Sequence, residues 1–291
     1  MDKFVINVPR TVENDFIGFS FLSSLFEKTE GFREMDIELE FKNTRWFEAN
    51  LASTLGAWLE LKFIHGCTIY FSNITNSIEN IFKKNGFYEK YQLGSIDDFY
   101  DSTIKFEIFS VKQDDDFSNY ITQKVIPKIR LDLSNPVMKS FKLSLNEIFI
   151  NVQLHAKSDK VYTCGQYYHT HQKVAFTITD MGNTIGNNVR EKLSKDYISD
   201  STAIEWATKY GNTTKEHTDV HTEAGGIGLH IIEEFLVENN GVFQIISGNG
   251  FWENNEGVIN KVNLDYYFPG TIVNIISKLE NTFTWENDIL F

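Results

Sequence analysis

Glu147, Asn151 and His155 are side chains that could act on a metal-bound phosphate, and they lie four residues apart. Residues at this spacing share one face of a helix, so we expect them to project together from a helix over 136–158. A carboxylate can accept a proton from an attacking water. An amide oxygen can bind Mg²⁺, which prefers hard oxygen ligands. Taken alone, the pattern is more typical of a polar helix face in water.

A second group follows an apolar strand that ends in the carboxylate of Asp180. An aspartate at the end of a strand can accept a hydrogen bond from an exocyclic amine such as N6 of adenine. Gly182, two residues later, would let the backbone approach a bound base closely. The alternative interpretation is an ordinary Asp-x-Gly turn.

A third group is the glycine-rich stretch that contains Gly226 and Gly228, directly before a helix expected over 229–237. Backbone N–H groups at a glycine-rich helix start bind phosphate. A simple entry loop to the helix would explain the glycines equally well.

In this order, the three groups resemble the N, G1 and G2 boxes of the GHKL ATPase superfamily, which includes gyrase, heat-shock chaperone and histidine kinase ATPases. Two positions depart from the boxes, because Thr184 replaces the second glycine of G1 and Ala224 the first glycine of G2. The resemblance extends over residues 117–280. The matching residues are Glu147, Asn151, His155 and Ala156, then Asp180, Gly182 and Ile185, then Gly226, Gly228 and Leu229, with an end pattern at 267–271.

The resemblance implies that Mg²⁺ and ATP are the cofactors. Asp180 would bind adenine, Asn151 would hold Mg²⁺, and Glu147 would orient or deprotonate the nucleophile. Residues 186–224 would form a mobile lid, in which Lys215 would contact the γ-phosphate or would simply be a solvated lysine. Besides the catalytic Glu147, the implied nucleotide contacts are Asn151, His155, Asp180, Gly182, Thr184, Ile185, Thr214, Lys215, Gly226, Gly228 and Leu229.

The elements that must position these residues along 117–280 are helices first, then an antiparallel hairpin and then further strands, which predicts an α+β fold. The resemblance implies an α/β sandwich of the Bergerat type. Helices are expected at 120–131, 136–158 and 229–237, and strands at 160–168, 173–180, 242–247, 261–268 and 271–276.

Residues 1–100 alternate strand and helix patterns, which predicts a small sheet built from crossover units. Strands are expected at 3–8, 35–41 and 67–71, and helices at 15–30, 47–63 and 74–84. This half resembles a STAS domain, the usual substrate of anti-sigma-factor serine kinases, and the region of the N box is similar to that branch. Residues 101–116 are expected to be an acidic transition that contains a strand at 103–111, and residues 281–291 a tail.

In STAS substrates a serine accepts the phosphoryl group at the start of the helix after the second strand. Here that place falls at Ala49 or Asn50, neither of which can be phosphorylated. The N-terminal half is therefore expected to be a docking or dimerisation module. Thr44, Ser53 and Thr54 lie nearby, so a small shift in alignment would reverse this expectation.

The formal net charge of −13 argues against binding to nucleic acid or to an anionic membrane surface. The start of the chain lacks a signal pattern, and no apolar stretch is long enough to span a bilayer, so we expect a soluble, cytoplasmic protein. Cys67 and Cys164 are expected to be reduced core residues.

Two classes of function fit these features. The first is an enzyme, either an ATPase or a Ser/Thr protein kinase with another protein as substrate, and the carboxylate of Glu147 favours it. The second is a nucleotide-gated interaction module with little or no turnover, which the two altered glycine boxes favour. Either class allows a homodimer.

Overall fold

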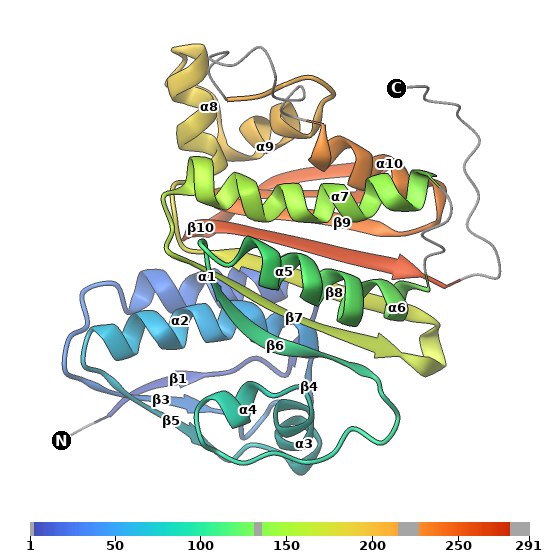
Figure 1. The fold of residues 1–291 in the computed structure, drawn as a ribbon. Coiled ribbons are helices and arrows are strands. Elements are labelled where there is room, and N and C mark those ends of the chain that lie inside the picture. Colours follow the sequence, from blue (N-terminus) through green and yellow to red (C-terminus); the bar gives the residue numbers. More distant parts are fainter. Residues whose placement is uncertain (1–2, 131–135, 215–226, 280–291) are drawn as a thin grey trace.

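The computed structural model describes residues 3–130, 136–214 and 227–279. The protein is a mixed α+β structure with a three-stranded sheet, a five-stranded sheet and a short two-stranded sheet. In Figure 1 the three-stranded sheet, two helices, the five-stranded sheet and a second set of helices form successive layers.

The N-terminal half forms the expected parallel sheet, in the order β1-β3-β5. Its strands are β1 (Phe4–Asn7), β3 (Asp36–Glu40) and β5 (Thr68–Ser72). The first connection contains α1 (Phe16–Lys28), which begins where the carboxylate of Asp15 accepts a 2.7 Å hydrogen bond from the N–H of Gly18. The second contains α2 (Ala52–Ile64). The crossover topology expected from the alternating pattern is therefore present.

One N-terminal helix starts later than its periodicity indicated. Phe47, expected as the first residue of the helix, instead belongs to β4 (Trp46–Phe47), which pairs with β2 (Thr11–Val12). Its aromatic ring is buried against Phe82, so packing rather than helix propensity decides its place. The remaining elements of this half are η1 (Ala49–Leu51), α3 (Asn76–Lys84) and α4 (Phe87–Lys90).

The five-stranded sheet is antiparallel throughout, in the order β6-β7-β8-β10-β9. Its edge strand β6 lies inside the segment expected as an acidic transition. The two strands expected at 261–268 and 271–276 form one strand, whose register shifts near Gly270. The strands are β6 (Thr103–Ser110), β7 (Lys160–Tyr168), β8 (Lys173–Asp180), β9 (Val242–Asn255) and β10 (Val258–Lys278).

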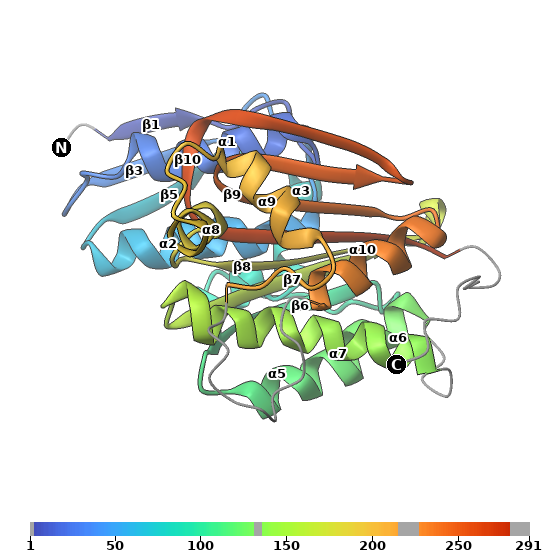
Figure 2. The same cartoon turned by 90° about the horizontal axis from the view of Figure 1, so that it is seen from above.

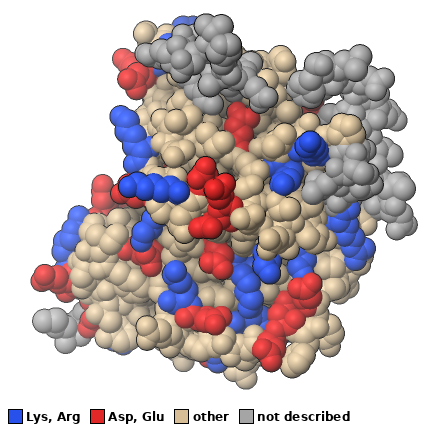
Figure 3. All heavy atoms as spheres, in the orientation of Figure 1, with Lys and Arg blue, Asp and Glu red and all other residues tan. Residues whose placement is uncertain are grey.

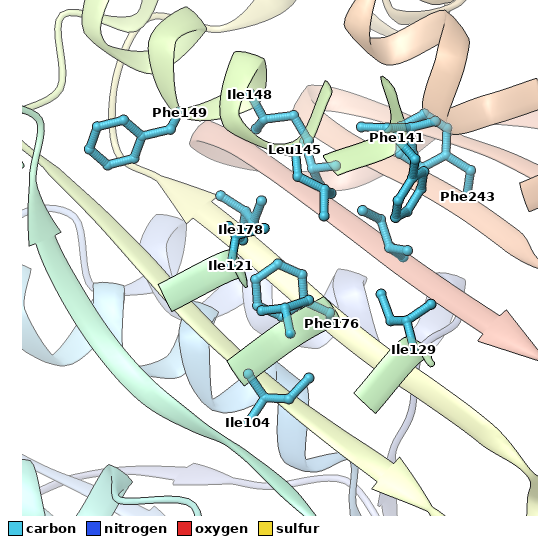
Figure 4. Packing of buried hydrophobic residues seen from close by; sticks show 14 of the residues in the cluster. Ile104, Ile121, Ile129, Phe141, Leu145, Ile148, Phe149, Phe176, Ile178 and Phe243 are labelled. Carbon is cyan, nitrogen blue, oxygen red and sulfur yellow. The ribbon is translucent and has the colours of Figure 1, made fainter. Parts of the chain in front are cut away.

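Helices cover one face of this sheet. An apolar core that includes Phe176 and Ile178 of β8 lies between the helices and the sheet (Figure 4). The helix expected from residue 120 begins earlier, at Asp114, because three aspartates in its first turn stabilise the positive end of the helix dipole. These helical segments are α5 (Asp114–Tyr120), η2 (Ile121–Val125), α6 (Ile126–Ile129), α7 (Pro136–Asn151), η3 (Val152–Ala156) and α10 (Gly228–Glu238).

Two further helices, α8 (Ile185–Leu193) and α9 (Asp200–Thr208), lie in the segment for which the family resemblance implied a lid. Seen from above in Figure 2, α10 lies between α7 and α9, over the same sheet. The periodicity of residues 186–224 did not indicate these helices, and α8 has only Gly186 and Val189 buried.

Helices α1 and α2 cover the opposite face of the five-stranded sheet, so the N-terminal half packs directly on the C-terminal half (Figure 1). Aromatic rings join the two halves, since Phe26 of α1 meets Phe268 of β10 edge to face at 5.0 Å. Cys67 and Cys164 are free thiols buried in the apolar cluster on this side of the sheet.

A buried polar network also joins the halves, and Asn50 is at its centre. The side-chain nitrogen of this fully buried residue lies 2.6, 2.8 and 3.0 Å from the side-chain oxygen atoms of Asn14, of Thr177 on β8 and of Asn274 on β10. Asn274 donates in turn to Gln244 of β9 at 2.7 Å. The position that would carry the phospho-acceptor in a STAS substrate is therefore enclosed between α2 and the large sheet.

On the face drawn in Figure 3, acidic and basic side chains are interspersed. Among the described residues, no helix is both long enough and apolar enough to cross a membrane.

Candidate functional site

A cleft opens over the five-stranded sheet, between α7 on one side and α8 and α9 on the other. Its volume is about 860 Å³ when the solvent at its mouth is included. Seven of the residues implied as catalytic or nucleotide contacts line this cleft: Glu147, Asn151, His155, Asp180, Ile185, Thr214 and Leu229. Residues from all three groups noted in the sequence thus meet at one place, although the groups are far apart in the chain.

Asp180 is the last residue of β8, and it lies at the bottom of the cleft with only 4% of its surface exposed. Burial raises the pKa of its carboxyl group to about 8, and a backbone hydrogen bond from Gly182 partly opposes this increase. Within the described part of the chain, its Oδ1 atom has no hydrogen-bond partner. A buried polar oxygen without a partner is costly, so this atom marks a place where a ligand could supply a donor.

The loop after Asp180 lies directly on the π-helical turn η3 at the end of α7. A Cβ atom on Gly182 would lie 2.2 Å from the carbonyl oxygen of Ala156, so only glycine fits here. The N–H of Asn183 donates to the same carbonyl. These contacts set the position of the loop relative to the helix that carries Glu147 and Asn151.

The α7 side of the cleft carries the expected carboxylate, amide and imidazole, all partly buried. The regular helix ends at Asn151, and the π-helical turn that follows contains His155. Such turns are common at functional sites. Nδ1 of His155 lies 3.4 Å from the hydroxyl of Thr214, which brings the segment after α9 to the end of the α7 helix.

Gly228, the first residue of α10, approaches the Glu147 side chain closely. A Cβ atom on Gly228 would lie 2.5 Å from Oε2 of Glu147 and 3.1 Å from its Cβ atom. The glycine therefore gives the carboxylate room at the start of this helix, although Gly228 itself is not among the residues that line the described cleft.

Thr184 was expected to contact the nucleotide, but the structure places it elsewhere. Its side chain is 1% exposed and caps α8 by accepting a 3.2 Å hydrogen bond from the N–H of Asn187. Neither Thr184 nor Gly182 is among the described residues that line the cleft. Threonine is a favoured helix cap, so Thr184 has a structural role at the start of α8.

Lys215 and Gly226 lie outside the described residues, as does Ala224. Within the described ranges, no group of three or more His, Cys, Asp or Glu side chains could hold a metal ion by itself. A cation here would therefore need oxygen atoms from its ligand as well as from Asn151, which is how Mg²⁺ is commonly held with phosphates.

Several cleft residues were not singled out from the sequence, namely Asn183, Asn188, Trp206, Asn212 and Thr271. Thr271 pairs with Asp180 across β8 and β10. The fully buried Ser247 lies behind this pair, where it accepts from the N–H of Ile185 at 2.9 Å and donates to the carbonyl of Gly270 at 2.8 Å. The end pattern at 267–271 was the only sequence signal for Thr271.

The cleft thus combines an enclosed acceptor at one end with a carboxylate and an amide on a neighbouring helix. Such an arrangement can hold a ligand that has both a hydrogen-bond donor and metal-bound oxygen atoms. Compared with models of known protein families and with curated proteins, the chain matches none.

Proposed function

We propose that the chain binds Mg-ATP in this cleft and hydrolyses it or transfers its γ-phosphoryl group to another protein. The observation that supports this most directly is the partnerless Oδ1 atom of buried Asp180, in the same cleft as Glu147 and Asn151. Adenine carries an exocyclic amine that can donate to this oxygen. The family resemblance of residues 117–280 supports the same assignment.

In this proposal, Asp180 selects the base and Asn151 supplies an oxygen to Mg²⁺. The metal, when bound, neutralises charge on the phosphates. Glu147 orients the attacking water or hydroxyl group and accepts its proton. The α10 helix starts beside Glu147, so its N–H groups can contribute to binding of phosphate.

The binding step can be tested by titration calorimetry of ATP with Mg²⁺ against the wild-type protein, Asp180→Asn and Asp196→Asn. Asp196 is an exposed aspartate between α8 and α9, so its variant controls for loss of a charge. We expect binding by the wild type and by Asp196→Asn, and affinity reduced at least about tenfold in Asp180→Asn. Absence of binding by the wild type, or equal affinity in all three proteins, would refute the proposal.

The second function is a nucleotide-gated interaction module, in which ATP changes the exposed surface without turnover. The capping role of Thr184 favours this second function. The GHKL family has a flexible glycine at this position, whereas Thr184 stabilises the start of α8 instead. Incubation with γ-labelled ATP separates the two functions. Label released as phosphate or placed on another protein supports the enzyme, whereas label that stays in bound ATP supports the gate.

A further inference from the structure

Asp200, the first residue of α9, joins three elements around the cleft. Its side chain is 9% exposed. Its Oδ1 atom accepts a 2.8 Å hydrogen bond from Nη1 of Arg190 on α8, and its Oδ2 atom accepts a 2.8 Å hydrogen bond from the N–H of Asn249 on β9. One carboxylate therefore connects both helices to the edge strand of the large sheet.

Three glycines make room for this carboxylate and for the backbone behind it. A Cβ atom on Gly186 would lie 1.9 Å from Oδ1 of Asp200, and one on Gly248 would lie 2.3 Å from Oδ2. Gly248 also has a φ of +61°, which other residues rarely adopt. A Cβ atom on Gly250 would lie 2.7 Å from the carbonyl carbon of Asp200. Close approach of Gly186 and Gly248 leaves the carboxylate little freedom to move.

The two helices that meet at Asp200 form one side of the cleft, which we call the α8–α9 wall (residues 185–208). Its inner surface consists of Ile185, Asn188, Val189, Trp206 and Ala207. The wall lies opposite Glu147 and Asn151 on α7, so its position sets the width of the cleft.

We propose that Asp200 is a positioning residue that holds the α8–α9 wall fixed on the sheet, so that the side chains of the wall are already in place for the nucleotide. This inference rests on the proposed function. The resemblance implied that residues 186–224 form a single mobile lid. In this proposal, residues 185–208 are instead a fixed part of the site.

The chemistry of the side chain makes this proposal testable with a substitution of nearly the same shape. A carboxylate can accept from Arg190 and from Asn249 at the same time. The amide of Asp200→Asn has one oxygen and one N–H₂ group, so it can accept from only one of these donors and directs its own donor at the other. Arg190→Gln is a milder second variant, because it keeps the Asp200–Asn249 bond and its own position is partly exposed.

The first measurement is hydrogen–deuterium exchange of the full chain without nucleotide, with Asp196→Asn as the matched control. We expect exchange in residues 185–208 to be at least about tenfold faster in Asp200→Asn, less so in Arg190→Gln, and unchanged in Asp196→Asn. Strands β7 and β8 should exchange as in the wild type, which distinguishes loosening of the wall from general unfolding. Unchanged exchange in the wall, or faster exchange spread equally over β7 and β8 in both variants, would overturn the proposal.

The second measurement is the affinity of each variant for Mg-ATP and for adenosine. A positioning role predicts that the affinities for Mg-ATP and for adenosine both fall by about tenfold. The melting temperature of Arg190→Gln should stay close to that of the wild type. Wild-type affinity in a variant whose wall has loosened would overturn this role. If the wild type binds neither ligand, the proposed function fails, and the exchange experiment still decides whether Asp200 holds the wall.

Discussion

The hydroxyl oxygen atoms of Thr54 on α2 and Thr179 on β8 lie 3.0 Å apart in the buried layer between the two halves of the chain. Thr179 is followed by Asp180, and consecutive residues of a strand point to opposite faces of the sheet. One face of β8 therefore contacts the N-terminal half while the other presents the acceptor in the cleft. The N-terminal half is packed directly behind the candidate site.

The raised pKa of Asp180 predicts how stability depends on pH in the absence of ligand. The folded value of about 8 lies above the ordinary 3.8, so the folded state holds this proton more tightly than the unfolded state. The stabilisation from this group is complete below pH 3.8 and is lost as the pH rises through about 8. Asp180→Asn stays neutral and should not show this loss.

Thermal melting of both proteins between pH 5 and pH 9 measures this difference. We expect the melting temperature of Asp180→Asn, relative to the wild type, to increase steadily with pH. Asp159→Asn, at an exposed position, should follow the wild type. A constant difference between Asp180→Asn and the wild type would show that the carboxyl group does not titrate in this range.

Glu147→Gln tests the proposed base without removing its shape. If Glu147 accepts the proton of the nucleophile, turnover should fall by about a hundredfold or more while the affinity for Mg-ATP changes little. Release of γ-labelled phosphate and titration calorimetry measure the two quantities. Glu191→Gln, at an exposed position on α8, is the control. Turnover that survives in Glu147→Gln would assign the proton to another group.

Gly182→Ala should separate the loop after β8 from the π-helical turn of α7. The new methyl group would lie 2.2 Å from the carbonyl oxygen of Ala156, so the loop must shift. We expect loss of ATP binding together with a lower melting temperature. Gly31→Ala is a suitable control, because a Cβ atom at Gly31 meets nothing within 4 Å. Normal binding by Gly182→Ala would mean that this loop does not shape the site.

Asn50→Ala tests the polar network between the two halves. Removal of its amide leaves the buried groups of Thr177 and Asn274 with fewer partners, so the free energy of unfolding should decrease by about 1–3 kcal/mol. Urea denaturation measures this change, and the exposed Asn43→Ala provides the reference. An effect no larger than that of the reference would show that the network contributes little.

Burial also predicts where phosphate will not be found. Thr44, Ser53 and Thr54, the hydroxyl groups closest to the acceptor position of a STAS substrate, are all fully buried. After incubation with Mg-ATP, mass spectrometry should find none of them phosphorylated. Phosphate on any of the three would require the N-terminal half to separate from the sheet.

Local patterns were sufficient for most elements of the fold. Strand β8 and its hairpin with β7 follow from apolar runs bounded by polar turns, and α1 follows from its periodicity. Boundaries were wrong at Phe47, where packing against Phe82 decided the element, and at the start of α5, which begins at an acidic first turn. Helix α8 was missed because it buries only Gly186 and Val189, and α9 was missed because most of the residues that it buries are polar or small.

The sequence by itself determined which residue types could bind a nucleotide and the order in which they occur. Glu147, Asn151 and Asp180 were recognisable because helix spacing and a strand end are local properties. Only the tertiary structure decided that Asp200 connects three elements and that Asn50 is enclosed against the large sheet. These roles depend on contacts between residues up to 224 positions apart, and no local pattern carries that information.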